Sequence, residues 1–359
     1  MVARRAPTND QQTMSRLAAH LAAWRSDSAL MTIAWLALVL VALMLAAIAI
    51  GKYPLSAGDM AGALWRAMTG SSSTSQVDTV LFSIRLPRVL AAVLVGAALA
   101  AAGAAYQGLF RNPLVSPDIL GVSSGAGLGA VLGIFLSLPV AGIQLLAFVG
   151  GLVTVGLVYL IASMVHNREP VLILVLAGVV VGSLAGAAIS LLKILADPYD
   201  QLPAIVFWLL GSLASVRGAE VWSAAPLVLI GLVPLVLLRW RINVLSLGDE
   251  EARALGIEAG RLRLIVVTAA TLMTASVVAV AGVIGWIGLV IPHLARMLVG
   301  PNFNRLLPAA LLMGATYMLL IDTLARTLAP IEIPLGVLTA IIGAPFFLWL
   351  LARGEEGWS

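Results

Sequence analysis

The sequence predicts an all-α integral membrane protein with about ten transmembrane helices. Of its 359 residues, 61% are hydrophobic and only 11% are charged, whereas about a quarter of the residues in a soluble domain are charged. Uncharged runs recur along the chain, and each is long enough to cross the hydrocarbon core of a bilayer, about 30 Å thick, as a helix of roughly 20 residues. Because lipid offers no hydrogen bonds to the backbone, such runs must be helical.

Ten spans are expected, separated by polar connections. Residues 1–28 are predicted to form a cytoplasmic N-terminal segment, residues 29–352 the transmembrane domain and residues 353–359 a cytoplasmic tail. The apolar run after residue 28 is longer than the core of a signal peptide, so we interpret it as a retained first span. The third and eighth spans are short and rich in glycine and proline, so we expect them to be tilted or broken. The predicted spans are residues 29–50, 86–107, 119–137, 143–165, 170–192, 221–239, 261–281, 284–299, 305–325 and 333–352.

Basic residues indicate the orientation of these spans. An even number of spans places both termini on one side of the membrane, and cytoplasmic loops carry an excess of lysine and arginine. With both termini inside, seven of the 21 basic residues fall in outer segments and the other 14 fall in inner ones. The outer seven are Lys52, Arg66, Arg85, Arg88, Lys193, Arg217 and Arg326. The net charge of +4 is thus spread over loop ends and forms no patch for nucleic acid.

Three connections are predicted to be more than turns. In the outer loop of residues 51–84, Ser56 is placed to cap a short helix that Gly70 ends. Residues 193–220 form a second outer segment with a short helix of its own, and residues 243–260 form a highly charged inner loop. One face of the helix in the first loop would carry Met60, Leu64 and Met68.

Glycines recur at every fourth residue of two spans. This spacing places them on one face of a helix, where another backbone can approach closely. Helix packing within the chain and a moving interface beside a pathway would both use such a face. The two series are Gly121, Gly125, Gly129 and Gly133, and Gly178, Gly182 and Gly186.

Few polar residues are candidates for an ion-pair, metal or catalytic site. Asp322 and Arg326 lie one helical turn apart near the outer end of the ninth span, which suits either a structural ion pair or a docking site. His293 has no second ligand at suitable spacing and the chain has no cysteine, so we expect no metal site. No clustered catalytic residues are found. We therefore expect neither a catalytic site nor a cofactor in this chain.

A phosphate-binding loop is also missing from the sequence. Such a loop needs a lysine followed by serine or threonine, but Lys52 is followed by Tyr53 and Lys193 by Ile194. If ATP drives this protein, a separate polypeptide hydrolyses it.

Four motifs resemble the signatures of one family. Two lie in the first half, R-L-P-R at residues 85–88 and Q-G-L-F-R-N-P-L-V-S-P-D-I-L-G-V-S-S-G-A at residues 107–126. Two lie in the second half, G-W-I-G-L-V-I-P-H-L-A-R at residues 285–296 and P-L-G-V-L-T-A-I-I-G-A-P-F at residues 334–346. Together they resemble FecCD/BtuC-like permeases of type II ATP-binding cassette (ABC) importers, which take up iron siderophores, haem and cobalamin. The resemblance covers roughly residues 50–352.

The resemblance implies the type II importer permease fold and a set of partners. These are a second copy of the chain with the pathway on the two-fold axis, two ATPase subunits that bind ATP–Mg, and a periplasmic solute-binding protein. It places the chain in the bacterial inner membrane. A ferric siderophore is the first expectation for the cargo and haem the second, with cobalamin and a molybdate-type oxyanion also open.

The resemblance also implies three sets of site residues. Arg85, Arg88 and Arg326 match arginines that receive acidic residues of the binding protein, although anchoring to lipid headgroups is an alternative. The inner loop matches the element that couples to the ATPase, as opposed to a merely solvated loop, through Asp249, Glu250, Glu251, Ala252, Arg253, Leu255 and Gly256. Pro170, Val171 and Leu172 match the inner gate. They are more apolar than their counterparts in the cobalamin importer, which makes cobalamin a less expected cargo.

Two other classes of protein, a secondary transporter and a membrane-embedded enzyme, agree less well with the sequence. A secondary transporter driven by an ion gradient usually needs carboxylates or other polar ligands near the middle of the bilayer, and the predicted spans lack them. A membrane-embedded enzyme would need a catalytic cluster, which the sequence does not suggest.

Overall fold

The computed structural model describes residues 9–51, 53–70, 75–165 and 169–352, and within them all regular secondary structure is helical. The predicted tail of residues 353–359 lies outside the described residues. Among these described residues, seven helices are long and apolar enough to cross a membrane. They are α1 (Asn9–Ala49), α4 (Leu86–Leu109), α6 (Val140–Met164), α7 (Pro170–Leu195), α9 (Gly218–Leu237), α12 (Ala259–Ala281) and α14 (Phe303–Thr327).

Three shorter apolar helices complete the predicted set of ten spans: α5 (Val122–Phe135), α13 (Ile287–Val299) and α15 (Leu335–Ala352). With 14 and 13 residues, α5 and α13 are about 20 Å long at 1.5 Å per residue, less than the thickness of the bilayer core. The third span is broken as predicted, because the 3₁₀ helix η2 (Pro117–Leu120) precedes α5 and Gly121 between them is left-handed, with φ 76°.

Three boundaries differ from the sequence prediction. Helix α1 begins at Asn9, so much of the predicted cytoplasmic N-terminal segment is helical, and only Ala29–Ala49 is its apolar part. The second span continues backwards through the π-helical turn η1 (Thr79–Arg85) to α3 (Gln76–Asp78). The inner loop begins later than residue 243, because α10 (Arg239–Leu245) occupies its start. Hydropathy marks the part of a helix that lies in lipid, so it misses polar helical extensions.

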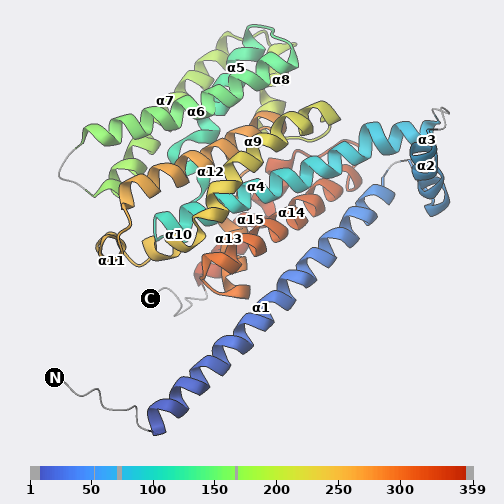
Figure 1. The fold of residues 1–359 in the computed structure, drawn as a ribbon. Coiled ribbons are helices and arrows are strands. Elements are labelled where there is room, and N and C mark those ends of the chain that lie inside the picture. Colours follow the sequence, from blue (N-terminus) through green and yellow to red (C-terminus); the bar gives the residue numbers. More distant parts are fainter. Residues whose placement is uncertain (1–8, 52, 71–74, 166–168, 353–359) are drawn as a thin grey trace.

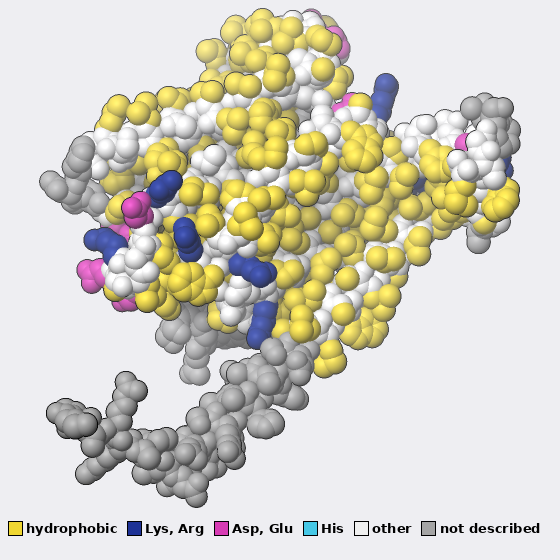
Figure 2. Space-filling model, viewed as in Figure 1, with side chains coloured by type: hydrophobic (Ala, Val, Ile, Leu, Met, Phe, Trp, Pro, Cys, Tyr) yellow, Lys and Arg dark blue, Asp and Glu magenta, His cyan; other side chains and the backbone are white. Residues whose placement is uncertain are grey.

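The helices form a bundle with two buried members. In the most apolar stretches of α4 and α12, 78% and 72% of the residues are buried, against 11% to 28% in α1, α6, α7 and α9. In Figure 1, α1 lies along one edge of the bundle beside α14, while α5 to α8 lie at the opposite edge. The surface between these edges is largely hydrophobic (Figure 2), as expected of a face in contact with lipid.

The predicted glycine series on α5 serves helix packing within the chain. A Cβ atom on Gly125 would lie 2.5 Å from the carbonyl oxygen of Gly150 on α6, and one on Gly129 would lie 2.0 Å from that of Leu146. On α7, a Cβ atom on Gly178 would lie 2.2 Å from the carbonyl oxygen of Ile119. The packing interpretation is therefore confirmed for these positions.

We expect Gly129→Ala to destabilise the protein by about 1–3 kcal/mol, the usual cost of overpacking. The added methyl group would meet the backbone of α6, which cannot rotate away as a side chain can. Gly156→Ala on α6 is the matched control, because nothing lies within 4 Å of its Cβ position. Thermal unfolding in detergent would measure both variants, and equal stabilities would contradict the packing argument.

Candidate functional site

Charged side chains gather at the two ends of the bundle. Following the predicted orientation, we call the end that holds Arg88 outer and the opposite end inner. The outer ion cluster consists of Arg85, Arg88, Asp322, Arg326 and Glu332. It joins the start of α4, the end of α14 and the connection to α15.

Arg88 is the centre of this cluster. Its Nε lies 2.9 Å from Oδ1 of Asp322, and its two terminal nitrogens pair with the two carboxylate oxygens of Glu332 at 2.8 and 3.0 Å. This bidentate pairing uses the planar fork of the guanidinium group and is among the strongest hydrogen-bonded arrangements in proteins. The side chain of Asp322 is fully buried, whereas that of Glu332 is 32% exposed.

The other two arginines hold the outer end of α1. Arg85 donates hydrogen bonds to the carbonyl oxygens of Ile48 and Ala49 at 2.6 and 2.9 Å and to that of Tyr53. Arg326 donates to the carbonyl oxygen of Ala47. The last carbonyl groups of a helix lack partners within the helix and carry partial negative charge, so both arginines stabilise the end of α1.

These contacts bear on the predicted docking role of the arginines. Arg85, Arg88 and Arg326 are only 4%, 8% and 8% exposed and all three point into contacts within the chain. Of the two interpretations of Asp322 and Arg326, a structural ion pair fits their burial, with Nε and Oδ2 3.8 Å apart. Docking stays a prediction. Glu332 was missed by the sequence analysis, although it is the one carboxylate in a short outer loop between Pro330 and Pro334.

The predicted short helix of the first outer loop is confirmed as α2 (Ala57–Thr69). Ser56 and Asp59 form a capping box, in which the Asp59 N–H donates to the Ser56 hydroxyl and the Ser56 N–H donates to the Asp59 carboxylate. Gly70 ends the helix in the left-handed region, with φ 66°. Leu64 and Met68 of the predicted apolar face are exposed. The second outer segment contains the other predicted short helix, α8 (Gln201–Leu209).

The capping box predicts a pH dependence. Hydrogen bonds from the Ser56 side chain and then its backbone hold the pKa of Asp59 below its ordinary value. Their contribution to the stability of α2 is therefore present above the ordinary pKa of aspartate, about 3.9, and lost as the pH falls through the lowered pKa. In Ser56→Ala we expect the pKa of Asp59 to rise toward its ordinary value in an NMR titration. Ser75→Ala, which removes the capping serine of α3, should leave it unchanged, and an equal rise there would refute this assignment.

At the inner end, the predicted coupling residues form a compact unit. Asp249–Ala254 are helix α11, and Gly256 follows it in the left-handed region with φ 76°. Ala252 is fully buried and anchors the helix, while Arg263 of α12 donates to both carboxylate oxygens of Asp249 at 3.2 Å. The remaining members face outward as an exposed, mainly acidic surface with an apolar residue at its end: Glu250, Glu251, Arg253 and Leu255, which is 58% exposed.

The predicted inner gate lies at the first turn of α7. Pro170 and Leu172 are exposed and Val171 is half-buried. The exposed face of α7 continues with apolar side chains, among them Val179 and Leu184, at 57% and 65% exposure. The gate stays a prediction.

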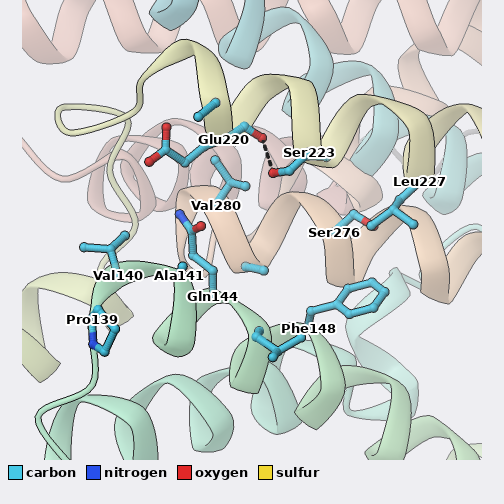
Figure 3. A pocket seen from close by; sticks show the side chains of 14 residues that line it. Pro139, Val140, Ala141, Gln144, Phe148, Glu220, Ser223, Leu227, Ser276 and Val280 are labelled. Carbon is cyan, nitrogen blue, oxygen red and sulfur yellow. Dashed lines mark hydrogen bonds between the residues drawn. The ribbon is translucent and has the colours of Figure 1, made fainter.

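A cavity of about 630 Å³ lies elsewhere, between the outer ends of α6, α9 and α12. Its wall is mainly apolar, with Phe148 and Leu227 at one end and the side chains of Gln144 and Glu220 at the other (Figure 3). The Glu220 carboxylate already accepts a hydrogen bond from the N–H of Arg217 at 3.0 Å, which caps α9. None of the predicted gate residues, Pro170, Val171 and Leu172, is among the residues that line this cavity.

A bundle of about ten apolar helices with an exposed acidic helix between two spans has the architecture of a transport permease driven by another subunit. The chain belongs to the FecCD transport family, whose pattern it matches over residues 38–353. It is thus the permease of an ABC importer, a multi-pass protein of the inner membrane, and the resemblance inferred from the motifs is confirmed.

Similar proteins transport different solutes. The chain is 42% identical to the molybdate import permease MolB of Haemophilus influenzae, over 90% of this chain and 95% of that one. It is 44% identical to a permease protein of Helicobacter pylori named for iron chelatin transport, over 78% of this chain and 84% of that one. A solved structure described as an inward-facing metal-chelate type ABC transporter superimposes with a TM-score of 0.81 at 40% identity, over 90% and 99% of the two chains.

Proposed function

We propose that this permease carries an iron chelate from a periplasmic binding protein to the cytoplasm, by alternating access powered by a separate ATPase. The observation that carries the mechanism is α11, an exposed acidic helix buttressed from behind by buried Ala252 and the Asp249–Arg263 pair. A rigid surface of this kind can transmit movement of a docked subunit to α12 and hence to the core of the bundle. The chain itself lacks a phosphate-binding loop, and we propose that it hydrolyses no ATP.

Molybdate is the second candidate cargo. One observation favours it: the molybdate permease MolB aligns with this chain over nearly the full length of both proteins. The iron chelatin permease has slightly higher identity over a shorter stretch. Since both solutes contain a metal, the same architecture would serve either of them.

The partners belong to the same proposal. A second copy of the chain would cover the exposed apolar face of α7 and complete the gate at Pro170, Val171 and Leu172. The outer ion cluster would receive the binding protein, because Arg88 and Arg326 pair with its two carboxylates while Arg85 has only carbonyl partners, which leaves one positive charge in excess. An acidic partner would approach from the side of Glu332, which is partly exposed. Both termini would lie in the cytoplasm.

Reconstitution in proteoliposomes tests the proposal. The chain, its ATPase subunit and its binding protein would be combined, and uptake of radioactive ferric chelate and of molybdate would be measured with and without ATP. We expect ATP-dependent uptake of ferric chelate that needs both partners. Uptake of molybdate alone would overturn the choice of cargo, and uptake driven by a proton gradient without the ATPase would overturn the mechanism.

A further inference from the structure

A second cavity, at the inner end of the bundle, has a composition that the transport mechanism does not use. We call it the inner basic cavity. It encloses about 360 Å³ between the inner ends of α4, α10 and α13 and the start of α14. Among the described residues that line it, three are basic, Arg111, His293 and Arg296, and none is an aspartate or a glutamate. The cavity is therefore suited to an anion.

Arg296 is incompletely paired within the described chain. One terminal nitrogen donates to Oε1 of Gln107 at 3.3 Å, and Gln107 in turn donates to the carbonyl oxygen of Leu289 at 3.0 Å. The Nε of Arg296 is buried and has no hydrogen-bond partner among the described residues. Leaving a buried charged group short of hydrogen-bond partners is costly, so an acceptor that enters the cavity and reaches the terminal nitrogens of Arg296 would be bound favourably.

Arg111 supplies the second cation at the mouth of the cavity. It is exposed, and its backbone lies in the left-handed region with φ 49°, which is unfavourable for a residue other than glycine. Strain of this kind persists where the surrounding structure enforces it and is often found at binding sites. Here it is found where the chain leaves α4, directly beside the cavity.

In a neighbouring pocket at the same end, basic residues do have a carboxylate beside them. That pocket is lined by Arg241 and Arg261, and Glu258 lies in the same wall. In the part of the chain that the structure describes, no carboxylate lines the inner basic cavity. On the side of α11, the Glu251 carboxylate flanks Gly248 together with Arg111. For Arg296, in contrast, no ion pair is found among the described residues, so Arg296 is the group that an external anion would balance.

The wall of the cavity also has an apolar side, formed by Ile242, Phe303 and Leu306. A free inorganic anion would gain nothing from these side chains, whereas an amphiphilic anion would use both sides. The cavity lies at the inner ends of membrane-spanning helices, where basic pockets between helices bind anionic headgroups. In Figure 2, basic and acidic side chains gather together on the part of the surface where α10 and α11 lie.

We propose that the inner basic cavity binds an anionic phospholipid of the cytoplasmic leaflet. The headgroup phosphate accepts hydrogen bonds from Arg296 and Arg111, and the acyl region lies against Phe303 and Leu306. The site adjoins the coupling helix, because the terminal nitrogen of Arg111 lies 3.7 Å from the Cβ position of Gly248, the residue before α11. This inference does not depend on which solute is transported.

Titration of the full-length chain in detergent with phosphatidylglycerol tests the proposal, with native mass spectrometry and intrinsic fluorescence as readouts. We expect saturable binding that weakens with salt and exceeds the binding of phosphatidylethanolamine. Arg111→Gln should weaken it about fivefold, the electrostatic contribution typical of one arginine near an anionic surface. Arg261→Gln is the matched control, an exposed inner arginine outside the cavity, and it should leave the affinity unchanged.

Three outcomes would overturn the proposal. Equal binding of phosphatidylethanolamine would show that the phosphate of any lipid suffices, and an equal effect of Arg261→Gln would show a general surface charge. Displacement of the lipid by inorganic phosphate at a similar concentration would make the cavity a site for free oxyanions. Because Arg111 is exposed, Arg111→Gln should keep the thermal stability of the parent protein, so a loss of binding reports on the site.

Discussion

Replacing Asp322 with asparagine is expected to lower the free energy of unfolding by about 3–5 kcal/mol, the usual cost of removing one partner of a buried ion pair. The carboxylate is fully buried and lies against two guanidinium groups, those of Arg88 and Arg326. Asparagine keeps the shape but removes the charge, so both cations would remain in a poorly solvated environment with only Glu332 to balance them.

Glu332→Gln is the matched control for this substitution. Glu332 pairs with the same Arg88, but its side chain is 32% exposed, so water can replace part of the lost interaction. We expect a loss of about 1 kcal/mol or less. Denaturant or thermal unfolding of the purified chain in detergent would measure both variants. If Asp322→Asn were no more damaging than Glu332→Gln, the outer ion cluster would not hold α1, α4 and α14 together.

The same geometry affects any test of docking. Reversing the charge of Arg85, Arg88 or Arg326 would remove hydrogen bonds to the end of α1 and to Asp322. A loss of binding-protein association in such variants would then be mixed with a loss of folding. Association should therefore be compared with the unfolding free energy of each variant before a docking role is assigned.

Replacing Leu255 with aspartate is expected to reduce ATP-driven uptake about tenfold or more while leaving the fold intact. Leu255 is 58% exposed at the end of α11, and exposed substitutions usually change stability by no more than about 0.5 kcal/mol. If the ATPase buries this side chain, its contribution of about 1.5–3 kcal/mol would be lost, which is ~10-fold to 100-fold in affinity. Association of the ATPase subunit and uptake in proteoliposomes would be measured together.

Gly260→Asp is the control for this second prediction. Gly260 is exposed in the first turn of α12, and nothing lies close to its Cβ position. Its replacement by aspartate therefore adds the same negative charge near the inner face. An acidic residue is tolerated at the start of a helix. Equal loss of uptake in both variants would point to charge at the inner face, and normal uptake in Leu255→Asp would remove α11 from the coupling step.

The local features of the fold were accessible from the sequence. Apolar runs of membrane length located ten spans, and Ser56 and Gly70 located both ends of α2, because caps depend on residues a few positions apart. Boundaries outside the membrane were less predictable. The extension of α1 to Asn9 lies outside its apolar run. The turn before Leu86 is partly apolar, but hydropathy does not show that it is π-helical and continuous with α4.

The sequence by itself determined the membrane class, the order of the spans and, through its motifs, the family. Only the tertiary structure decided the partners of the charged residues. Arg88 meets Asp322 and Glu332 across more than 230 positions, and Arg111 and Arg296 meet at a cavity formed by four different helices. Secondary structure and membrane insertion follow from the local order of residues, whereas the pairing of buried charges depends on which helices pack together, and no local periodicity records it.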